Sequence, residues 1–407
     1  METTPPEATT QAKATDSPLT AIVRDEIAAA GGRITFARFM ALALYHPEHG
    51  YYLAPERRPG RGGDFLTAPE THPFFGITIA RQIAELWDRL GQPAEFTIRE
   101  YGAGVGGLAY DILAGLAEAA PALAGTVRYR LIEPNPYRRA EAMAAMREVG
   151  LDQRVTIETV DPNGVAEPIT GVIIANEVAD AFPVHRLVWG DDPRPGLRER
   201  YVTWRDGAFA EEEGELSPEA RASDPDGMLQ AAGVTLATLA TGDTIEVSPA
   251  AAAWFTAAGR GLGRGYLIAI DYGYEAAELY QGHRLAGTLR AYSQHTVSDD
   301  PFRHLGRQDL TAHVNFTALR RAGEAAGLTT AGFTTQGAFL SSLGLGDLLV
   351  RQQTEPGVTA QAYLDTRAAV LHLIDPGGMG RFGVLVMARD APVVPPLRGL
   401  AIAPPSF

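Results

Sequence analysis

The sequence predicts an α/β fold in which a mixed β-sheet is covered by helices on both faces. Short apolar runs rich in β-favouring residues alternate with longer stretches whose apolar residues recur at helical spacing. The first of these runs leads directly into a turn rich in glycine. Such βαβ alternation gives a parallel sheet, and ligands of such sheets bind at the carboxyl ends of the strands. Parallel strands are expected at 96–98, 129–133, 155–160, 171–175 and 266–271, and an antiparallel pair at 328–336 and 382–389 is expected to close the sheet.

The length of the chain sets its expected organisation. With 407 residues, 45% of them hydrophobic, it is long enough to bury a large core. The alternation of strands and helices breaks off twice, which indicates two insertions on the substrate side, and the acidic stretch 211–226 is expected to be an exposed loop. The predicted organisation is a disordered tail at 1–17, a helical segment and lid at 18–91, a main domain at 92–390 with insertions at about 190–245 and 275–316, and a C-terminal tail at 391–407.

Charge and composition exclude several classes of function. The formal net charge of -14 argues against nucleic acid as a partner, because a polyanion would be repelled, whereas a cationic substrate would be tolerated. The absence of cysteine excludes disulfides and thiolate ligands, and the histidines are too scattered for a metal motif, so we expect no metal. No apolar run is long enough to span a membrane, and residues 1–17 resemble no targeting peptide, so the expected location is the cytoplasm of a bacterium. The charge does not indicate an oligomeric state.

The glycine turn lies within Phe96–Leu113, which reads FTIREYGAGVGGLAYDIL. Gly102, Gly104 and Gly106 permit left-handed backbone angles and let a ligand touch the main chain, and the following helix offers unpaired amides. The G-x-G-x-x-G pattern also fits a dinucleotide loop, and a purely structural turn is a further alternative. Glu100 would face a pyrophosphate unfavourably but would attract the ammonium and sulfonium of S-adenosylmethionine. The turn therefore favours S-adenosylmethionine as the cofactor.

Polar side chains follow two further strands of the predicted sheet. Glu133 ends the second strand, where a carboxylate can accept both hydroxyls of a ribose, although a solvated carboxylate is the plain alternative. The fourth strand opens into Asn176, Glu177 and Asp180, next to the expected cofactor. Helix capping by Asn176 or Asp180 would also explain these residues. We assign Asn176 to the cofactor site and the two carboxylates to the catalytic site.

The stretch 45–76 is long, irregular and dense in Tyr, His, Gly and Pro. Loops of this length are usually functional, so we expect a lid over the glycine turn, with an ordinary surface loop as the alternative. A second polar insertion follows the fifth strand. The substrate-binding candidates in the stretch 45–76 are Tyr51 and Tyr52 as channel walls, Asp64 and Glu70. In the insertion after the fifth strand the candidate is His295, with Asp309 and His313 as weaker candidates.

Many separate blocks of the chain, in order, resemble the MidA family, whose mitochondrial member is a complex I assembly methyltransferase. The resemblance implies a class I, Rossmann-like methyltransferase that uses S-adenosylmethionine, and the mitochondrial relative further implies methylation of a protein arginine. It places the family's glycine loop at Gly102, Gly104 and Gly106 and its ribose ligand at Glu133. The blocks are YHPEHGYY, GGDFLTAPE followed by FFG, EYGAGVGGLAYDIL, IEPN, ANEVADAFPVHR, IDYG, GTLRAYSQH, GRQDLTAHVNF and MGRFGVLVMAR.

Arginine methylation assigns a role to the carboxylates. A guanidinium is a poor nucleophile, and a carboxylate can orient it by paired hydrogen bonds and offset its charge. Glu177 is the first candidate for this role and Asp180 the second, although Glu177 could instead bind the amino group of the cofactor. A protein or peptide is the expected substrate. A small-molecule acceptor, and an assembly or binding factor that keeps the fold without turnover, remain the alternatives.

Overall fold

The structure is a computed structural model that describes residues 17–55, 67–159, 167–190, 195–235, 238–293 and 296–402. The predicted tail at 1–17 lies outside the described residues except for Ser17, which caps the first helix. Two of the predicted substrate-binding residues, Asp64 and His295, also lie outside the described residues.

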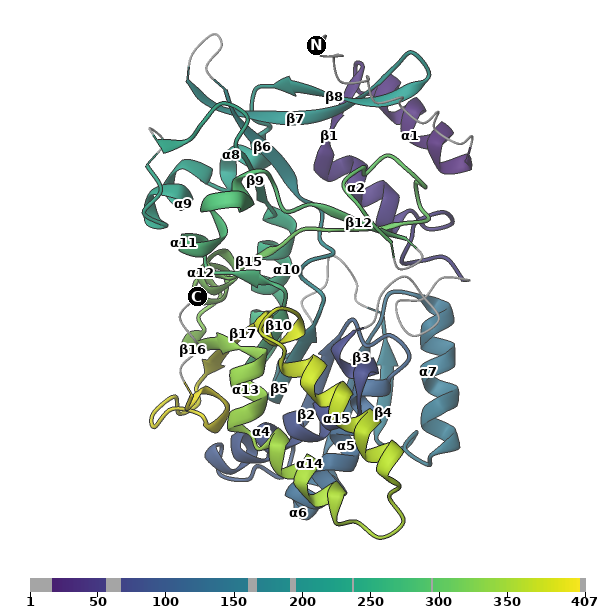
Figure 1. Cartoon of the computed structure of the whole chain (residues 1–407), viewed down its shortest axis with the longest axis vertical. Helices are drawn as coiled ribbons and strands as arrows, with labels where there is room; N and C mark the ends of the chain where they lie inside the picture. The colour runs from purple at the N-terminus through teal and green to yellow at the C-terminus, as the bar shows by residue number, and fades with distance from the viewer. Residues whose placement is uncertain are drawn as a thin grey trace, which may run out of the picture.

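A seven-stranded mixed sheet forms the lower half of the molecule (Figure 1). Its five neighbouring strands β10, β5, β2, β3 and β4 run parallel, and β17 and β16 close one edge in antiparallel pairings. This arrangement confirms the predicted parallel set and the closing pair. In spatial order the strands are β16 (Thr329–Thr335), β17 (Gly383–Arg389), β10 (Leu262–Asp271), β5 (Ile169–Asn176), β2 (Thr97–Tyr101), β3 (Arg128–Ile132) and β4 (Val155–Glu158).

Helices cover both faces of this sheet because the strand side chains alternate between two cores. On β5, Val172 and Ile174 belong to the core beneath α4 and α5, whereas Ile173 packs with α10 and α12. The confirmed architecture is therefore a sheet buried on both sides. The helices of this half are α3 (Ala68–Thr71), α4 (Phe74–Arg89), α5 (Gly107–Ala119), α6 (Pro121–Thr126), α7 (Pro136–Glu148), α10 (Pro249–Arg260), α12 (Phe316–Ala325), α13 (Gln336–Ser342), α14 (Leu345–Gln353) and α15 (Ala360–Ile374).

A second sheet, at the upper end in Figure 1, joins the chain start to the first insertion. It pairs β1 with β7 and has its own apolar core, to which α1 and α2 contribute. No second sheet was predicted from the sequence. Its β1–β7 pairing joins segments more than 150 residues apart, although β6, β7 and β8 pair with near neighbours in the chain. Its elements are α1 (Pro18–Ala29), β1 (Arg33–Thr35), α2 (Phe36–Tyr45), β6 (His185–Gly190), β7 (Gly196–Arg205), β8 (Ala208–Gly214) and β9 (Thr244–Val247).

The prediction of an exposed loop at 211–226 was wrong. Its acidic start belongs to β8, where Glu211 and Glu212 form ion pairs with arginines, and its remainder contains α8 (Pro218–Ala222) and the start of α9 (Pro225–Ala231). Acidic composition indicated solvent exposure, but strand pairing with β7 decided the local structure. Short elements of the second insertion lie between the two halves, namely β11 (Gly273–Tyr274), α11 (Ala276–Leu279), η2 (Gly282–Leu285), β12 (Arg290–Ser293), β13 (Thr296–Ser298), β14 (Asp309–Thr311) and β15 (Val314–Asn315).

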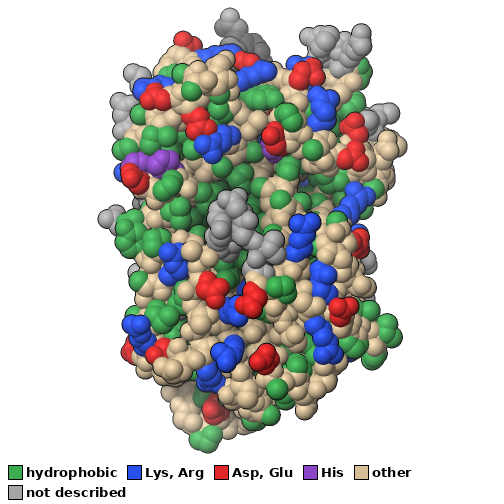
Figure 2. Space-filling view, turned by 180° about the vertical axis from the view of Figure 1, so that it is seen from behind, with side chains coloured by type: hydrophobic (Ala, Val, Ile, Leu, Met, Phe, Trp, Pro, Cys, Tyr) green, Lys and Arg blue, Asp and Glu red, His purple; other side chains and the backbone are tan. Residues whose placement is uncertain are grey.

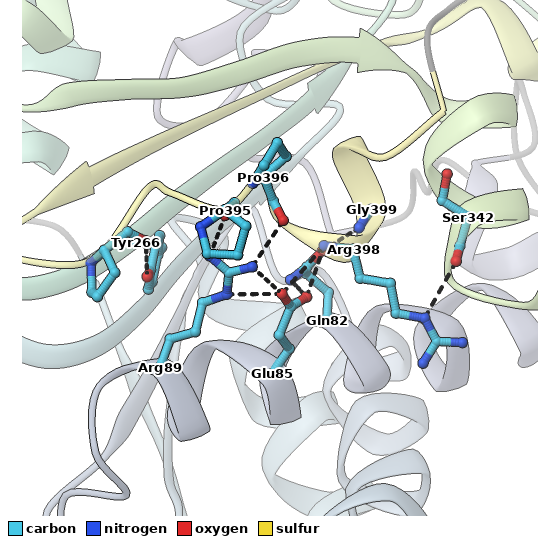
Figure 3. Close-up of polar contacts among 10 residues, drawn as sticks. Gln82, Glu85, Arg89, Tyr266, Ser342, Pro395, Pro396, Arg398 and Gly399 are labelled. Carbon is cyan, nitrogen blue, oxygen red and sulfur yellow. Dashed lines mark hydrogen bonds and ion pairs between the residues drawn. The ribbon is translucent and has the colours of Figure 1, made fainter.

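The chain after β17 packs along α4 (Figure 3). Leu397 is fully buried, and Gln82, Glu85 and Arg89 on α4 bind backbone atoms of residues 395–399. The segment predicted as a C-terminal tail is thus held on the main sheet as far as η4 (Arg398–Leu400). The contacts are Arg89 Nη1 and Nη2 to the carbonyls of Pro395 (2.6 Å) and Pro396 (2.8 Å), the Arg398 amide to Glu85 Oε2 (2.9 Å), and the Gly399 amide to Gln82 Oε1 (2.9 Å).

The surface carries both signs of charge. On the face shown in Figure 2, basic side chains are interspersed with acidic ones over the part of the chain that the structure describes. The net charge of -14 is therefore not gathered into one acidic field on this face. Among the described helices, none is long and apolar enough to cross a membrane.

Candidate functional site

The glycine turn joins β2 to α5 through three left-handed residues. Gly102, Gly104 and Gly106 have φ angles of 67°, 54° and 83°, a region that side chains disfavour. A Cβ on Gly102 would lie 2.8 Å from Val178 Cγ2, and one on Gly106 would lie 2.9 Å from Met146 Cε. A Cβ on Gly104 would meet nothing within 4 Å. Packing therefore explains two of these glycines, whereas Gly104 faces open space that a ligand can fill.

Glu133 holds the glycine turn from the neighbouring strand. It follows β3, and its two carboxylate oxygens accept the amides of Gly104 (2.9 Å) and Asn135 (2.8 Å). Burial raises the pKa of Glu133. Because a carboxylate already occupies the amide of Gly104, a pyrophosphate would meet an acidic group at this point. The turn is thus poorly suited to a dinucleotide and fits a nucleoside with a cationic tail.

Glu100 lies deeper than the sequence argument assumed. Its side chain is buried within the sheet and accepts a hydrogen bond from the hydroxyl of Tyr129 (2.6 Å). Burial raises the pKa of Glu100 to about 8. The hydrogen bond from Tyr129 and the burial hold the carboxyl group of Glu100 inside the sheet, and its predicted contact with the cofactor stays a prediction. The carboxyl group that contacts the glycine turn directly is that of Glu133.

Glu177 follows β5 in a conformation that few side chains adopt. Its φ angle is 51°, and such strain in a residue other than glycine is concentrated at functional sites. Its Oε1 accepts the amide of Ala68 (2.9 Å) and the Nδ2 of Asn176 (3.0 Å). Burial, the largest cause, raises the pKa of Glu177 to about 8. Its chain neighbour Val178 packs against Gly102, so Glu177 lies beside the glycine turn.

Asp271, at the end of β10, fixes the loop that carries Glu177. Its Oδ2 accepts the amides of Val178 (3.1 Å), Ala179 (2.8 Å) and Asp180 (3.3 Å), and its Oδ1 accepts the amide of Tyr272 (2.9 Å). Three of these backbone donors belong to the loop, and their bonds to one carboxylate hold it in place. The sequence analysis placed Asp271 only as the end of a strand. The strand-end rule that selected Glu133 would have selected it as well.

Asp180 lies behind Tyr272. Its side chain is 5% exposed and hydrogen bonded to that of Tyr272, and burial raises its pKa to about 6. Its Oδ1 has no hydrogen-bond partner among the described residues. Asp180 does not line the pocket described next, but its charge helps to raise the pKa of Glu177, which does.

A pocket of about 320 Å³ opens beside Glu177. Aromatic rings form much of its wall: Tyr272 and His313 meet edge to face with centroids 5.6 Å apart, and Phe382 lies 5.6 Å from Tyr272. The pocket therefore combines a carboxyl group with π faces, which suits a planar cation. The lining residues are Glu177, Tyr272, Gly273, Tyr274, Tyr292, Thr311, His313, Gly377, Gly378, Arg381 and Phe382.

The described substrate candidates of the stretch 45–76 are Tyr51, Tyr52 and Glu70, and they do not line the pocket. Tyr51 is fully buried in the core of the upper half, so it forms no open channel wall. Tyr52 stacks on Tyr45 and donates a hydrogen bond to Asp309 Oδ2 (2.9 Å). Glu70 completes a capping box with Thr67 at the start of α3. None of these residues lines the pocket, whereas His313, a weaker candidate, does.

The sequence analysis missed most of the aromatic wall and Arg381. Tyr272 and Tyr274 could have been found from their place after β10, at the ligand-binding edge of the sheet. Arg381 and Phe382 gave no such signal, because the turn η3 (Met379–Arg381) reaches the pocket from the other side of α15. Their proximity to Glu177, some 200 positions earlier in the chain, is a property of the fold alone.

Comparison with known proteins supports the cofactor assignment. The model of a family described as "putative S-adenosyl-L-methionine-dependent methyltransferase" matches residues 78–334. A crystal structure from Burkholderia thailandensis with S-adenosyl-homocysteine bound is similar with a TM-score of 0.81 and 33% identity, covering 95% of each chain. A second structure from the same organism gives a TM-score of 0.79 at 34% identity, covering 95% of this chain and 94% of the other. The cofactor of the present chain is S-adenosyl-L-methionine, and the open position at Gly104 together with Glu133 fits its nucleoside.

More distant relatives carry a more specific name. The mitochondrial protein arginine methyltransferase NDUFAF7 of Xenopus laevis is 27% identical over 383 residues, which cover 86% of this chain and 79% of the relative. The human protein of that name is 26% identical over 359 residues, covering 81% and 75%. The similarity extends over both halves of the molecule.

Proposed function

We propose that this chain, which belongs to the family of S-adenosyl-L-methionine-dependent methyltransferases matched above, methylates the guanidinium of an arginine side chain in a protein. The methyltransferase class follows from the family, and the proposal concerns the acceptor. The observation that carries it is the pocket that Glu177 lines together with aromatic residues. The next residue, Val178, contacts Gly102 of the glycine turn. The names of the relatives at 25–27% identity point to the same acceptor.

The chemistry of a guanidinium fits this pocket. Bound cofactor supplies a methyl group that is already activated, so the protein mainly has to align the acceptor and exclude water. Glu177 would accept hydrogen bonds from the guanidinium and offset its charge. The rings of Tyr272 and Tyr274 would shield the acceptor from solvent and bind its planar face. A second carboxylate is thus not required at the acceptor, which agrees with the position of Asp180 behind Tyr272.

The shape of the pocket supports an acceptor that is part of a polypeptide. Its volume of about 320 Å³ lies at the low end for ligand pockets, a size suited to one long side chain. Its rim includes Gly377, which is exposed, and Gly378, which is half-buried. A Cβ on either glycine would have atoms of Asp375 as its nearest neighbours, at 3.3 Å or more. The backbone of a substrate could therefore lie across this rim while one side chain enters.

The test is a labelling experiment with bacterial lysate, the purified protein and cofactor labelled in the methyl group. We expect label in the protein fraction and, after acid hydrolysis, in methylated arginine. The matched control is Glu177→Gln, which keeps the shape of the side chain and should lose most of the label. Label confined to small molecules would replace the proposal with a metabolite methyltransferase. Cofactor binding by calorimetry without any labelled product would favour a binding factor that keeps the fold without turnover.

A further inference from the structure

The acceptor pocket contains a cation as well as a carboxyl group. Arg381 lines it together with Glu177, although a positive charge repels a guanidinium that enters the same space. The guanidinium carbon of Arg381 lies 5.7 Å from the ring centroid of Tyr274, which also lines the pocket. A pocket with one acidic and one basic wall is complementary to a ligand that carries both charges.

The backbone around Arg381 is held firmly. The amides of Gly378 and Gly380 both donate to the carbonyl of Asp375 (2.9 Å each), and the amide of Arg381 donates to the carbonyl of Gly378 (3.2 Å). A Cβ on Gly380 would lie 2.3 Å from the carbonyl oxygen of Ile374, so this turn accommodates only glycine there. The base of the Arg381 side chain is therefore fixed at the pocket by local packing, as a recognition residue requires.

A second arginine lies on the same ring but serves a different role. The guanidinium of Arg284 lies 4.0 Å from the centroid of Tyr274 and forms an ion pair with Glu278 (3.2 Å). Arg284 does not line the pocket. Two arginines thus lie at the ring of Tyr274, and of these two only Arg381 lines the acceptor pocket.

We propose that Arg381 forms an anion subsite, and that the preferred acceptor is an arginine with a carboxylate close to its guanidinium. This inference rests on the proposed function and narrows its substrate class. Glu177 would bind the guanidinium, while Arg381 would bind the carboxylate in the paired geometry that guanidinium groups favour. The carboxylate comes either from an Asp or Glu side chain near the arginine or from the terminus of a chain that ends in arginine.

The experiment uses two peptide libraries made from one bacterial lysate. Cleavage after lysine gives peptides with internal arginines, whereas cleavage after lysine and arginine gives peptides that end in arginine with a free carboxylate. Each library is incubated with the protein and with cofactor carrying a deuterated methyl group, and mass spectrometry locates every labelled arginine. Wild type, Arg381→Gln, Arg381→Glu and the control Arg284→Gln are compared.

For wild type we expect labelled internal arginines to have Asp or Glu within two residues roughly tenfold more often than unlabelled ones, a ratio equivalent to one partly buried charged hydrogen bond. Arg381→Gln should abolish the preference, Arg381→Glu should shift it to basic neighbours, and Arg284→Gln should retain it. Preferential label on peptides that end in arginine would assign the carboxylate to the chain terminus. An unchanged pattern in both Arg381 variants would refute the subsite while leaving arginine methylation intact. Absence of labelled arginine in both libraries with wild type would refute the proposed function, and the subsite with it.

Discussion

The cofactor edge and the acceptor pocket meet at Glu177 but are built in different ways. The cofactor edge, formed by the glycine turn with Glu100 and Glu133, comes from one stretch of chain, and its described contacts include backbone amides held by a carboxylate. The acceptor pocket draws side chains from five segments between Glu177 and Phe382. The first depends on the shape of the main chain, whereas the second depends on side-chain chemistry. Substitutions at the cofactor edge should therefore change cofactor affinity, whereas substitutions in the acceptor pocket should change kcat/KM.

The largest effect is expected for Gly104→Val at the cofactor edge. Gly104 has a φ of 54° and borders open space, so a branched side chain would both strain the turn and fill the cofactor cradle. We expect cofactor affinity to fall by more than about 100-fold in calorimetry because the side chain would occupy the space of the ligand. The left-handed backbone adds a loss of stability of about 1–2 kcal/mol.

The matched control for Gly104→Val is Gly150→Val. Gly150 has a φ of 70° and is also open to 4 Å, but it follows α7, away from the turn. Both variants should lose similar stability in thermal unfolding, and only Gly104→Val should lose cofactor binding. Equal cofactor affinities in the two variants would show that the cofactor lies elsewhere.

In the acceptor pocket, Glu177→Gln should affect turnover more than cofactor affinity. The amide keeps a similar shape but cannot offset the charge of a guanidinium, so we expect kcat/KM to fall by about 100-fold. Cofactor affinity should change little. A large loss of cofactor affinity would instead assign Glu177 to the amino group of the cofactor, and Glu177 would then belong to the cofactor edge.

The pH dependence of the reaction provides a second probe of Glu177. Burial raises its pKa to about 8, so the neutral acid predominates below that pH and the carboxylate above it. If the carboxylate binds the acceptor, kcat/KM should rise by about tenfold per pH unit below the pKa and level off above it. The Glu177→Gln variant should lack this step. A wild-type profile that falls with rising pH over this range would contradict the assignment.

The difference between the regions also explains how much could be predicted from the sequence. Gly102, Gly104, Gly106, Glu133 and Glu177 all lie in or directly after strands of one sheet, and strand ends can be located from local periodicity. The predicted sheet and its closing pair required no other information, whereas the choice of S-adenosylmethionine over a dinucleotide also needed Glu100 and the resemblance of many blocks of the chain to a known family.

The acceptor pocket could be predicted only in part. Arg381 and Phe382 reach it from beyond α15, and Tyr292 reaches it from a strand of the second insertion, so no spacing along the chain links them to Glu177. Conversely, Tyr51 was selected because aromatic residues in a long loop often bind ligands, but its ring completes the core of the upper half. Local composition indicates which residues are unusual, whereas tertiary packing determines what they touch.

A substitution outside the cofactor edge and the acceptor pocket shows what a loss of stability alone does to cofactor affinity and kcat/KM. Glu85 on α4 accepts the amide of Arg398 (2.9 Å) and bonds from Gln82 (2.8 Å) and Arg89 (2.8 Å). Glu85→Ala would leave these donors without their partner and loosen the C-terminal segment, at a cost of about 1–2 kcal/mol in the free energy of unfolding.

The control Glu118→Ala removes an exposed ion pair with Arg351 and should cost far less, because both side chains are more than half exposed. Chemical denaturation would measure both costs. Neither variant should change cofactor affinity or kcat/KM, since these residues touch neither the glycine turn nor the pocket. A loss of activity in Glu85→Ala without loss of stability would mean that the C-terminal segment communicates with the pocket through α4 and the turn η3.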